Sequence, residues 1–401
     1  MTSNRPKHHL AVALLLLCLR ASASVTDAPA HSHGEAKPTE QPSKADTTAS
    51  GPTAQPARLT LANALAERGD IAGAELAFRQ VIEAPRTSAA EKQEALLGLA
   101  RVFRRHSMLA KSTAVYEKLL AEFPKCPLAP DALLELGRTL RAMGAQKQAI
   151  GKFYSVLNST LKVQSDDMSR YQLLAKTAQF EIAETYFETG NYEEAVKSFA
   201  RLQLLDLAPT DRARARFMAS YSLKLLGNLE AAAKSLRDFV DAWPDDENAP
   251  EARYLLALTL RQLGRNDLAL AETLQLLRAV SSEATPPQRL AYWQRRTGNQ
   301  LANDFFIQGD LASALAIYRS LADSSTDAQW RAPILYQIGL CYERLDAVAD
   351  AAQAYESVLG ALKGEVAPEL VDLSRMASWR LGMLGWKGSL RDAAGGAAPA
   401  S

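Results

Sequence analysis

The chain has 401 residues, of which 47% are hydrophobic, and it carries 46 basic and 45 acidic side chains. This is enough apolar material for a large buried core. The net charge of +1 excludes a general electrostatic attraction to nucleic acid or to an anionic membrane, so such a partner would need a local patch.

Residues 1–23 have the pattern of a secretory signal peptide. A basic start is followed by the apolar run Leu10–Leu19 and by the small-residue motif Ala21–Ala23. Ten helical residues span about 15 Å, half the thickness of a bilayer core, so the run is too short for a membrane span. We expect cleavage after Ala23 and an exported protein, periplasmic or envelope-associated. A lipid anchor on Cys18 is the alternative, but Leu17 is not the small residue that a lipoprotein signal requires there.

The segments on either side of the central region have little apolar surface. Residues 24–57 are rich in Pro, Ala, Ser and Thr, and residues 386–401 are similar in composition. Such segments cannot bury enough surface to offset their ordering entropy. We therefore predict a disordered linker at 24–57 and a disordered tail at 386–401.

Residues 58–385 show helical periodicity and one recurring pattern. Its clearest copy has Ala183, Tyr186, Gly190, Ala195 and Phe199 at fixed intervals. Copies start near residues 55, 93, 130, 176, 213, 250, 295 and 332. The pattern resembles the tetratricopeptide repeat (TPR), a unit of about 34 residues that forms two antiparallel helices. The resemblance implies an all-α fold, a right-handed superhelical solenoid of about eight hairpins, closed by a C-terminal capping helix near Met376–Met383.

The repeated residues suit packing rather than chemistry. A small residue lets two helices approach closely, and a glycine such as Gly190 leaves the first helix with a positive φ. Each hairpin alone exposes an apolar face, which stacking on its neighbours hides. We interpret these positions as core.

The spacing of the copies indicates an internal duplication. From the second copy onward, the start-to-start distances are 37, 46, 37, 37, 45 and 37 residues, and residues 123–144 align without gaps with residues 243–264. This predicts a three-repeat cassette near 93–212 that is duplicated near 213–331. The extra residues precede the third repeat of each cassette. They predict a first helix lengthened by about two turns, with an N-cap at Ser165 or Asp166 in one copy and a proline in the first turn of the other.

The linker at residues 121–137, AEFPKCPLAPDALLELG, is also similar to linkers in the TPR modules of bacterial outer-membrane assembly lipoproteins and cell-division coordinators. Cys126 stands where those linkers usually have Ser, and the corresponding linker at residues 243–252, WPDDENAPEA, lacks the middle Pro. Those proteins have fewer repeats and usually a lipoprotein signal. The resemblance therefore implies an envelope scaffold without naming its role.

No motif for catalysis, metal binding or a cofactor is present in the repeats. Gly144–Phe153 departs from the phosphate-loop spacing, and His106 is the only histidine of this region. The acidic segment 244–251 lacks the glycine and the terminal glutamate of a calcium loop, which indicates a solvated linker. Cys126 and Cys341 are far apart in the repeat order, so we expect two free thiols. The sequence therefore predicts a protein that is not an enzyme.

The TPR resemblance implies a concave groove lined by the first helices, where a peptide or partner protein binds. Arginines followed by aromatic side chains would suit an acidic or C-terminal peptide. The candidate groove residues are Arg101, Arg104, Arg105, Arg138, Arg141, Phe180, Phe187, Tyr221, Tyr254, Arg261, Asn299, Asn303 and Tyr336. The alternative is an architectural or assembly subunit that uses the convex face or the ends of the solenoid. Neither reading involves nucleic acid or a transmembrane span in the mature chain.

Overall fold

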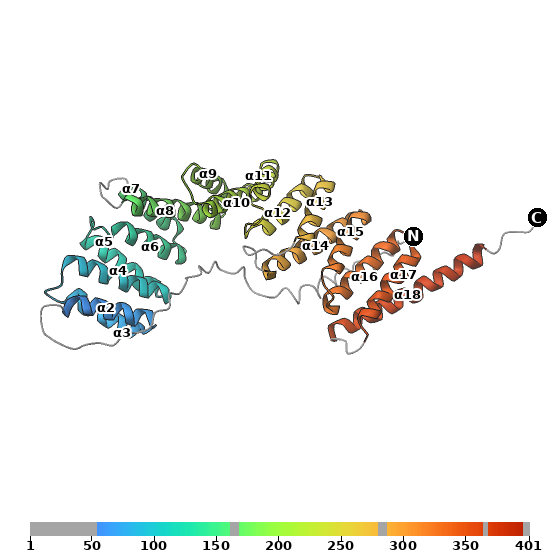
Figure 1. Cartoon of the computed structure of the whole chain (residues 1–401), viewed down its shortest axis with the longest axis horizontal. Coiled ribbons are helices and arrows are strands. Elements are labelled where there is room, and N and C mark those ends of the chain that lie inside the picture. The colour runs from blue at the N-terminus through green and yellow to red at the C-terminus, as the bar shows by residue number, and fades with distance from the viewer. Residues whose placement is uncertain (1–53, 161–167, 280–286, 364–367, 396–401) are drawn as a thin grey trace, which may run out of the picture. The chain divides into compact units, whose positions relative to one another are not determined.

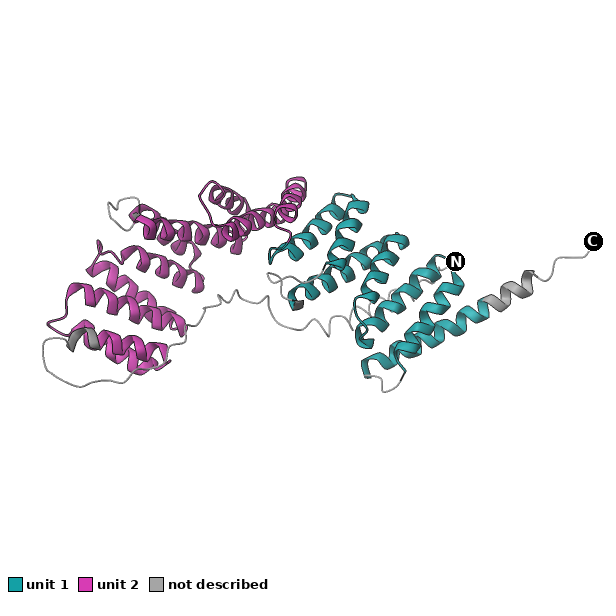
Figure 2. Ribbon diagram, viewed as in Figure 1, with its two compact units in different colours: residues 1–43, 245–401 teal, residues 44–244 magenta. Residues whose placement is uncertain are grey.

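The computed structural model describes residues 54–160, 168–279, 287–363 and 368–395. Over these residues it consists of the helices α2–α18 and contains no strand (Figure 1). The fold is all-α, a solenoid of paired helices, as the repeat pattern predicts. The described helices fall into two compact units, with the boundary between Pro244 and Asp245 (Figure 2).

The unit that ends at residue 244 contains five helical hairpins. Within it, the first helices of successive hairpins contact one another, the pair α8 and α10 through side chains such as Phe187 and Tyr221, and each second helix contacts the next first helix. The helices are α2 (Ala54–Glu67), α3 (Ile71–Glu83), α4 (Ala89–Arg105), α5 (Leu109–Glu122), α6 (Ala129–Ala142), α7 (Gln146–Thr160), α8 (Met168–Glu188), α9 (Tyr192–Leu202), α10 (Pro209–Leu225) and α11 (Leu229–Ala242).

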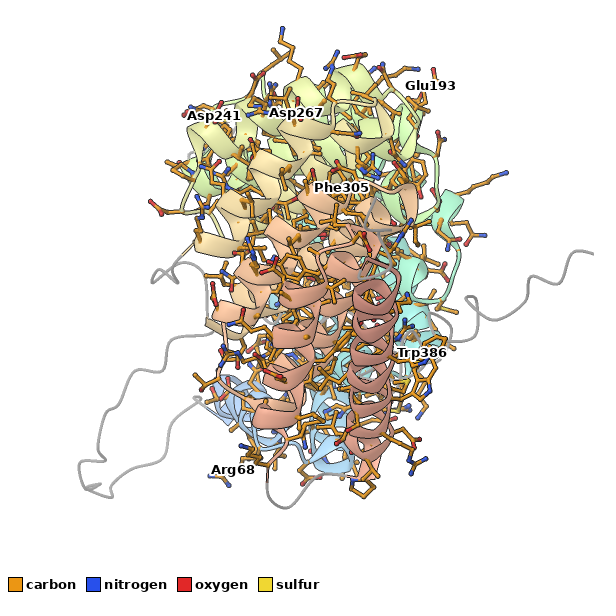
Figure 3. All side chains as sticks on the ribbon, turned by 90° about the vertical axis from the view of Figure 1, so that its right-hand side faces the viewer. Arg68, Glu193, Asp241, Asp267, Phe305 and Trp386 are labelled. Carbon is orange, nitrogen blue, oxygen red and sulfur yellow. The ribbon has the colours of Figure 1, made fainter. Side chains whose placement is uncertain are left out.

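The unit that begins at residue 245 contains three further hairpins and a last, unpaired helix. Its core includes Phe305, which is fully buried and labelled in Figure 3. The helices are α12 (Ala249–Gln262), α13 (Asn266–Arg278), α14 (Pro287–Gln308), α15 (Leu311–Asp323), α16 (Ala328–Arg344), α17 (Val348–Ala361) and α18 (Pro368–Gly395).

A residue with positive φ separates the two helices of a hairpin. Gly190 has a φ of 74°, a left-handed conformation that glycine adopts without a steric penalty. The next residue, Asn191, caps α9 because its side chain accepts a hydrogen bond from the N–H of Glu194. In the second hairpin Ser107 takes the place of the glycine, with a φ of 58°. This residue makes that copy of the repeat harder to recognise in the sequence.

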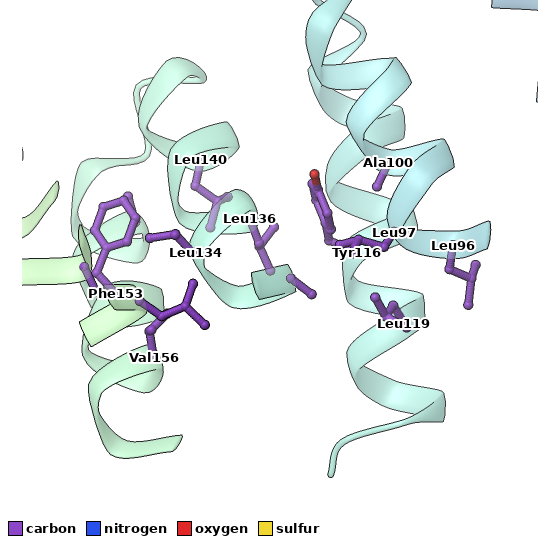
Figure 4. Packing of buried hydrophobic residues seen from close by; sticks show 14 of the residues in the cluster. Leu96, Leu97, Ala100, Tyr116, Leu119, Leu134, Leu136, Leu140, Phe153 and Val156 are labelled. Atoms are coloured by element: carbon purple, nitrogen blue, oxygen red, sulfur yellow. The ribbon is translucent and has the colours of Figure 1, made fainter. Parts of the chain in front are cut away.

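The core is built from the small and aromatic positions of the repeat. A Cβ added at Gly137 would lie 2.4 Å from the ring of Phe153, so α6 and α7 approach this closely only because glycine has no side chain. Phe153 and Tyr116 are fully buried (Figure 4). One buried cluster continues from Leu96 of α4 to Ile182 of α8, across several hairpins. The interpretation as core is confirmed for Ala183, Ala195 and Phe199, whereas Tyr186 is only partly buried and Gly190 is exposed in the turn between the helices.

The helices α8 and α14 are longer than the other first helices. They have 21 and 22 residues, whereas the other first helices have 14 or 17. The difference corresponds to about one to two turns, and it reaches the predicted two turns against α6 and α12. The expected cap at Ser165 or Asp166 lies outside the described residues. Helix lengths also recur in order, with 17, 14, 14, 15, 21 and 11 residues in α4–α9 and 17, 14, 14, 13, 22 and 13 in α10–α15. This supports the duplicated cassette.

The added turns place an arginine at the third residue of both long helices. Arg170 of α8 binds the carboxylate of Asp131 at the start of α6. Arg289 of α14 donates to Glu247 at 3.0 Å and to Asn248 at 2.8 Å, just before α12. Each arginine therefore ties its helix to the start of the preceding first helix. The acidic segment before α12, expected as a solvated linker, is held by this contact.

The last helix differs from the sequence expectation. The predicted cap Met376–Met383 is only the middle of α18, which continues to Gly395 and thus through ten residues of the expected disordered tail. Leu373, Ala377 and Leu384 bury one side of α18 in a cluster with residues of α16 and α17. The boundary at residue 386 is therefore wrong.

Candidate functional site

A row of alternating arginines and glutamates crosses the first helices α4, α6, α8 and α10. Residues three or four apart on a helix share one face, so α6 presents Glu135, Arg138 and Arg141 together and α8 presents Glu181 and Glu184 together. We call this set the charged row. It consists of Arg104, Glu135, Arg138, Arg141, Glu181, Glu184 and Arg214.

Glu181 is the centre of the charged row. Its side chain is only 9% exposed, accepts a hydrogen bond from Arg138 Nε at 2.6 Å and lies 2.8 Å from Arg141 Nη2. Glu135 lies 3.0 Å from Arg138 Nη1 and 2.9 Å from Arg104 Nε. Burial by itself would lower the pKa of Arg138, but Glu181 and Glu135 outweigh burial and raise it. The charges of α4, α6 and α8 therefore neutralise one another.

Glu184 extends the charged row to α10. It forms an ion pair with Arg214, whose guanidinium also lies 5.5 Å from the ring centre of Phe180. Arg141 Nη1 lies 4.0 Å from Glu184. Burial raises the pKa of Glu184, and the neighbouring Glu181 adds to this effect, although Arg214 and Arg141 oppose it.

A second polar cluster lies on α12 and α14, within the unit of residues 245–395. The guanidinium of Arg296 lies 5.4 Å from the ring centre of Tyr254, 5.9 Å from that of Tyr292 and 5.6 Å from that of Trp293. It donates to the hydroxyl of Tyr292 at 2.5 Å and to that of Tyr254 at 3.4 Å. The hydroxyl of Tyr254 donates in turn to Gln300 Oε1 at 2.7 Å. We call these aromatic residues and their arginine the Arg296 cluster.

The Arg296 cluster has a fixed inner part and an accessible outer part. Tyr254 is buried, Trp293 is half-buried, and Tyr292 is 51% exposed together with an exposed Arg296. Next to the cluster, burial raises the pKa of Glu251, although the nearby arginines lower it. The hydrogen bonds and ring contacts hold the guanidinium in one orientation, while its outer edge faces solvent.

A cleft of about 460 Å³ lies between the second helices α13 and α15. It contains none of the residues predicted from the sequence. Its lining residues are Leu274, Leu277, Arg278, Ala316, Arg319, Ser320, Asp323 and Ser324.

The described part of the chain has few side chains that could bind a metal ion or act as a reactive thiol. No group of three His, Cys, Asp or Glu side chains there is placed to hold a metal ion. Cys126 and Cys341 are both free, as expected, and burial raises the pKa of Cys341 to about 12. None of the described helices combines the length and the apolar character needed to span a bilayer.

Comparison with protein families identifies the hairpins. One tetratricopeptide-repeat model matches residues 59–125 and 217–284, and a second matches residues 177–204 and 334–360. The chain contains tetratricopeptide repeats. No curated protein matches it significantly.

Several solved structures are similar to the TPR array at low sequence identity. A TPR protein from Parabacteroides merdae is 16% identical over 71% of this chain and 98% of its own, with a TM-score of 0.40. MamA from Desulfovibrio magneticus is 14% identical over 46% and 92%, with a TM-score of 0.37. The apo form of RapI is 10% identical over 78% and 100%, with a TM-score of 0.44. Similarity at this level carries no information about function.

Within the TPR hairpins, the predicted arginines of α4 and α6 divide into two groups. Arg104, Arg138 and Arg141 belong to the charged row and already have glutamate partners. Arg101 and Arg105 at the end of α4 are exposed. A ligand carboxylate at Arg138 or Arg141 would have to displace Glu181, so only the exposed pair is available as simple anion contacts.

Most of the predicted aromatic residues of the repeats pack against other rings. The ring centres of Phe187 and Tyr221 are 5.4 Å apart, which joins α8 to α10. Phe180 is buried, and Tyr336 is buried against Tyr355 with ring centres 5.4 Å apart. These residues stabilise contacts between neighbouring TPR helices. Of the predicted aromatic residues, Tyr254 belongs to the partly exposed Arg296 cluster.

The predicted polar residues of α12 and α14 also have structural contacts. Arg261 lies 4.4 Å from the ring centre of Phe305 and donates to Asn266 Oδ1 at 2.6 Å. Asn303 accepts a hydrogen bond of 2.6 Å from the hydroxyl of Tyr318, and Asn299 is half-buried.

The sequence reasoning missed the glutamates of the charged row and three members of the Arg296 cluster. The sequence does contain a pattern that could have indicated the glutamates, because Glu181, Glu184 and Glu188 recur at helical spacing on one face. Arg296 lies on α14 three and seven residues before the predicted Asn299 and Asn303, which is the spacing of one helix face. Trp293 and Tyr292 lie in the added turns of α14, before the repeat template begins.

Proposed function

We propose that this chain is a non-catalytic scaffold of the bacterial cell envelope that binds a peptide segment of a partner protein on its first helices. TPR scaffolds mediate protein–protein interaction. The observation that carries the proposal is the Arg296 cluster, which combines Tyr, Trp and Arg, the residue types enriched at the energetic centres of protein interfaces.

The geometry of the Arg296 cluster suits an acidic residue beside an apolar one. The guanidinium is held by ring contacts and by two tyrosine hydroxyls, so little side-chain freedom is lost when a carboxylate binds its outer edge. The exposed face of Tyr292 offers an apolar surface next to it. In the charged row, by contrast, each arginine has a glutamate partner, which favours a structural role there.

Site-specific photocrosslinking tests the peptide site. A photoreactive phenylalanine analogue in place of Tyr292 should give a discrete adduct in the cells that make the protein. The matched control is Leu268 on the second helix α13, which is similarly exposed at 48%. Substitution of Arg296 by Glu should abolish the adduct without loss of helicity. Equal adducts from Leu268, or adducts that survive Arg296→Glu, would contradict the proposal.

Export is a separate part of the proposal. It is supported by the basic start, the short apolar run and the small-residue motif of residues 1–23. Mass spectrometry of the protein from fractionated cells should find it in the envelope fraction with Ser24 at its N-terminus. A cytoplasmic protein that keeps residues 1–23 would contradict this part alone.

The architectural alternative is favoured by one feature of the last helix. Trp379 and Trp386 of α18 are 60% and 58% exposed, on a helix whose opposite side is buried. Exposed apolar side chains at the end of a stack of helices are typical of an assembly surface.

A further inference from the structure

The two cassettes share one arginine whose surroundings differ between them. Residues 123–144 align with residues 243–264 without gaps, so Arg261 of α12 occupies the position that Arg141 has in α6. The long helices α8 and α14 also align without gaps, up to the positive-φ glycine that follows each of them. The contacts of the two arginines can therefore be compared position by position.

Arg141 has three carboxylate groups of α8 around it. Its Nη2 lies 2.8 Å from Glu181 and its Nε lies 3.7 Å from Glu188. Its Nη1 lies 4.0 Å from Glu184. The three glutamates are three to seven residues apart and therefore share one face of α8. In the first cassette, the chain itself neutralises this arginine.

Arg261 lacks all three of these carboxylates. Its guanidinium lies 4.4 Å from the ring centre of Phe305, and its Nη1 donates to Asn266. Its Nε and Nη2 are buried and have no hydrogen-bond partner among the described residues. In Arg141 these are the two atoms closest to carboxylates. The positions of α14 that align with the three glutamates are Gln300, Asn303 and Ile307.

One acidic side chain of α14 acts on Arg261 without pairing with it. Burial raises the pKa of Asp304, and the attraction of Arg261 opposes this only in part. The two side chains form no ion pair within the described part of the chain. A buried charged donor without an acceptor is unfavourable, so any carboxylate that reaches it gains a strong hydrogen bond.

Building on the proposed function, we propose that Arg261 binds a second acidic side chain of the partner peptide, in the place that Glu181 takes at Arg141. The first acidic side chain lies at Arg296. Tyr254, which contacts Arg296, precedes Arg261 by seven residues of α12, or about 10 Å. An extended peptide covers this distance in three residues of about 3.3 Å each. The partner segment therefore has acidic residues at positions i and i+3.

The two cassettes indicate why the peptide binds the second one. A carboxylate at Arg141 would have to displace Glu181, whereas a carboxylate at Arg261 replaces no existing bond. The Arg261 side chain is half-buried, so a rotation of its guanidinium on the Phe305 ring brings Nε and Nη2 to the surface. The complementary charge of this site, which the first cassette supplies from its own chain, comes from the partner here.

Selection of randomised displayed peptides on the purified full chain tests this proposal. The native chain should enrich peptides with two acidic residues three positions apart. Arg261→Gln should retain the first acidic residue and lose the second. Ile307→Glu should do the same, because it restores the carboxylate that Glu188 places near Arg141. Ile307→Gln is the matched control, and since Ile307 is 65% exposed these changes leave the core intact.

Fluorescence anisotropy with the most enriched peptide, synthesised with a fluorescein label, measures the size of the effect. Arg261→Gln and Ile307→Glu should each weaken binding about tenfold relative to Ile307→Gln, since one charged hydrogen bond is lost. Without peptide, Ile307→Glu should have a higher urea midpoint than Ile307→Gln, because Arg261 then has a partner within the chain. All three variants should keep their helicity in circular dichroism.

The possible failures can be told apart. Enrichment of peptides with a single acidic residue would overturn this proposal and leave the site at Arg296 intact. A pair of acidic residues that is still required by Arg261→Gln would place the second carboxylate elsewhere and would also overturn it. Enrichment without any acidic residue would contradict the proposed function as well. Tighter binding of a single-stranded DNA oligonucleotide than of the peptide would assign Arg261 to phosphate instead.

Discussion

Replacement of Glu181 by Gln should destabilise the unit of residues 54–244 more than any exposed charge substitution on it. The carboxylate is nearly buried and binds Arg138 and Arg141 at 2.6 and 2.8 Å. Glutamine keeps the shape but removes the charge. Two partly buried guanidinium groups then lose their common partner.

The structure sets the size of this effect. Removal of one partner from a fully buried ion pair costs about 3–5 kcal/mol. Here Arg138 and Arg141 remain 31% and 21% exposed and keep Glu135 and Glu184 nearby, so water and the remaining carboxylates compensate part of the loss. We expect Glu181→Gln to lower the free energy of unfolding by about 2–3 kcal/mol, which corresponds to about 5–10 °C in the midpoint for a unit of this size.

Urea denaturation followed by far-UV circular dichroism measures this loss, and hydrogen exchange should locate it in α6 and α8. The matched control is Glu193→Gln, because Glu193 pairs with Lys197 at 2.9 Å while its side chain is 68% exposed. This pair should contribute nothing measurable. The double substitution Glu181→Gln with Arg141→Gln should cost less than the sum of the two single ones. If Glu181→Gln behaves like Glu193→Gln, the charged row does not hold these hairpins together.

Three further outcomes are expected. Gly137→Ala should lower the free energy of unfolding by about 1–3 kcal/mol, measured by thermal unfolding, because the added Cβ would meet the Phe153 ring. Gly151→Ala is the control and should cost no stability, since no described atom lies near its added Cβ. Equal stability of the two variants would refute the close packing of α6 and α7. The raised pKa of Glu251 means that the folded state holds this proton more tightly, so stability falls as pH rises from the ordinary value of 4.5 through the raised pKa. Glu251→Gln should remove this decline in urea titrations at several pH values, and an unchanged pH profile would refute it. Cys341, with a pKa of about 12, should react with a thiol reagent only when denaturant opens its hairpin, and fast labelling of the native chain would contradict its burial.

The hairpins could be predicted from sequence because their core contacts are local and periodic. Gly137 and Phe153 lie 16 positions apart, as Ala183 and Phe199 do in the clearest copy, so the spacing alone identified these positions as core. The same logic predicted the long helices α8 and α14 from the extra residues before the third repeat of each cassette.

The partners of the charged side chains could not be predicted in this way. Arg138 and Glu181 are 43 residues apart, and their contact depends on how α6 and α8 are rotated relative to each other. A repeat template gives the positions that face the groove, but not which of them neutralise one another. Tyr292 and Trp293 were missed for another reason, because they lie in added turns for which the template has no positions.

The arginine at the third residue of each long helix limits how this array can be shortened or extended. Excision of the second or third hairpin of a cassette would remove either the acceptor or the arginine, and would leave a charged group without its partner at the new junction. Excision of one whole cassette of about 120 residues would join two equivalent positions of the repeat array, so each arginine would keep an acceptor. Engineered versions of this protein should therefore tolerate the insertion or deletion of three hairpins together. Insertion or deletion of a single hairpin should destabilise them.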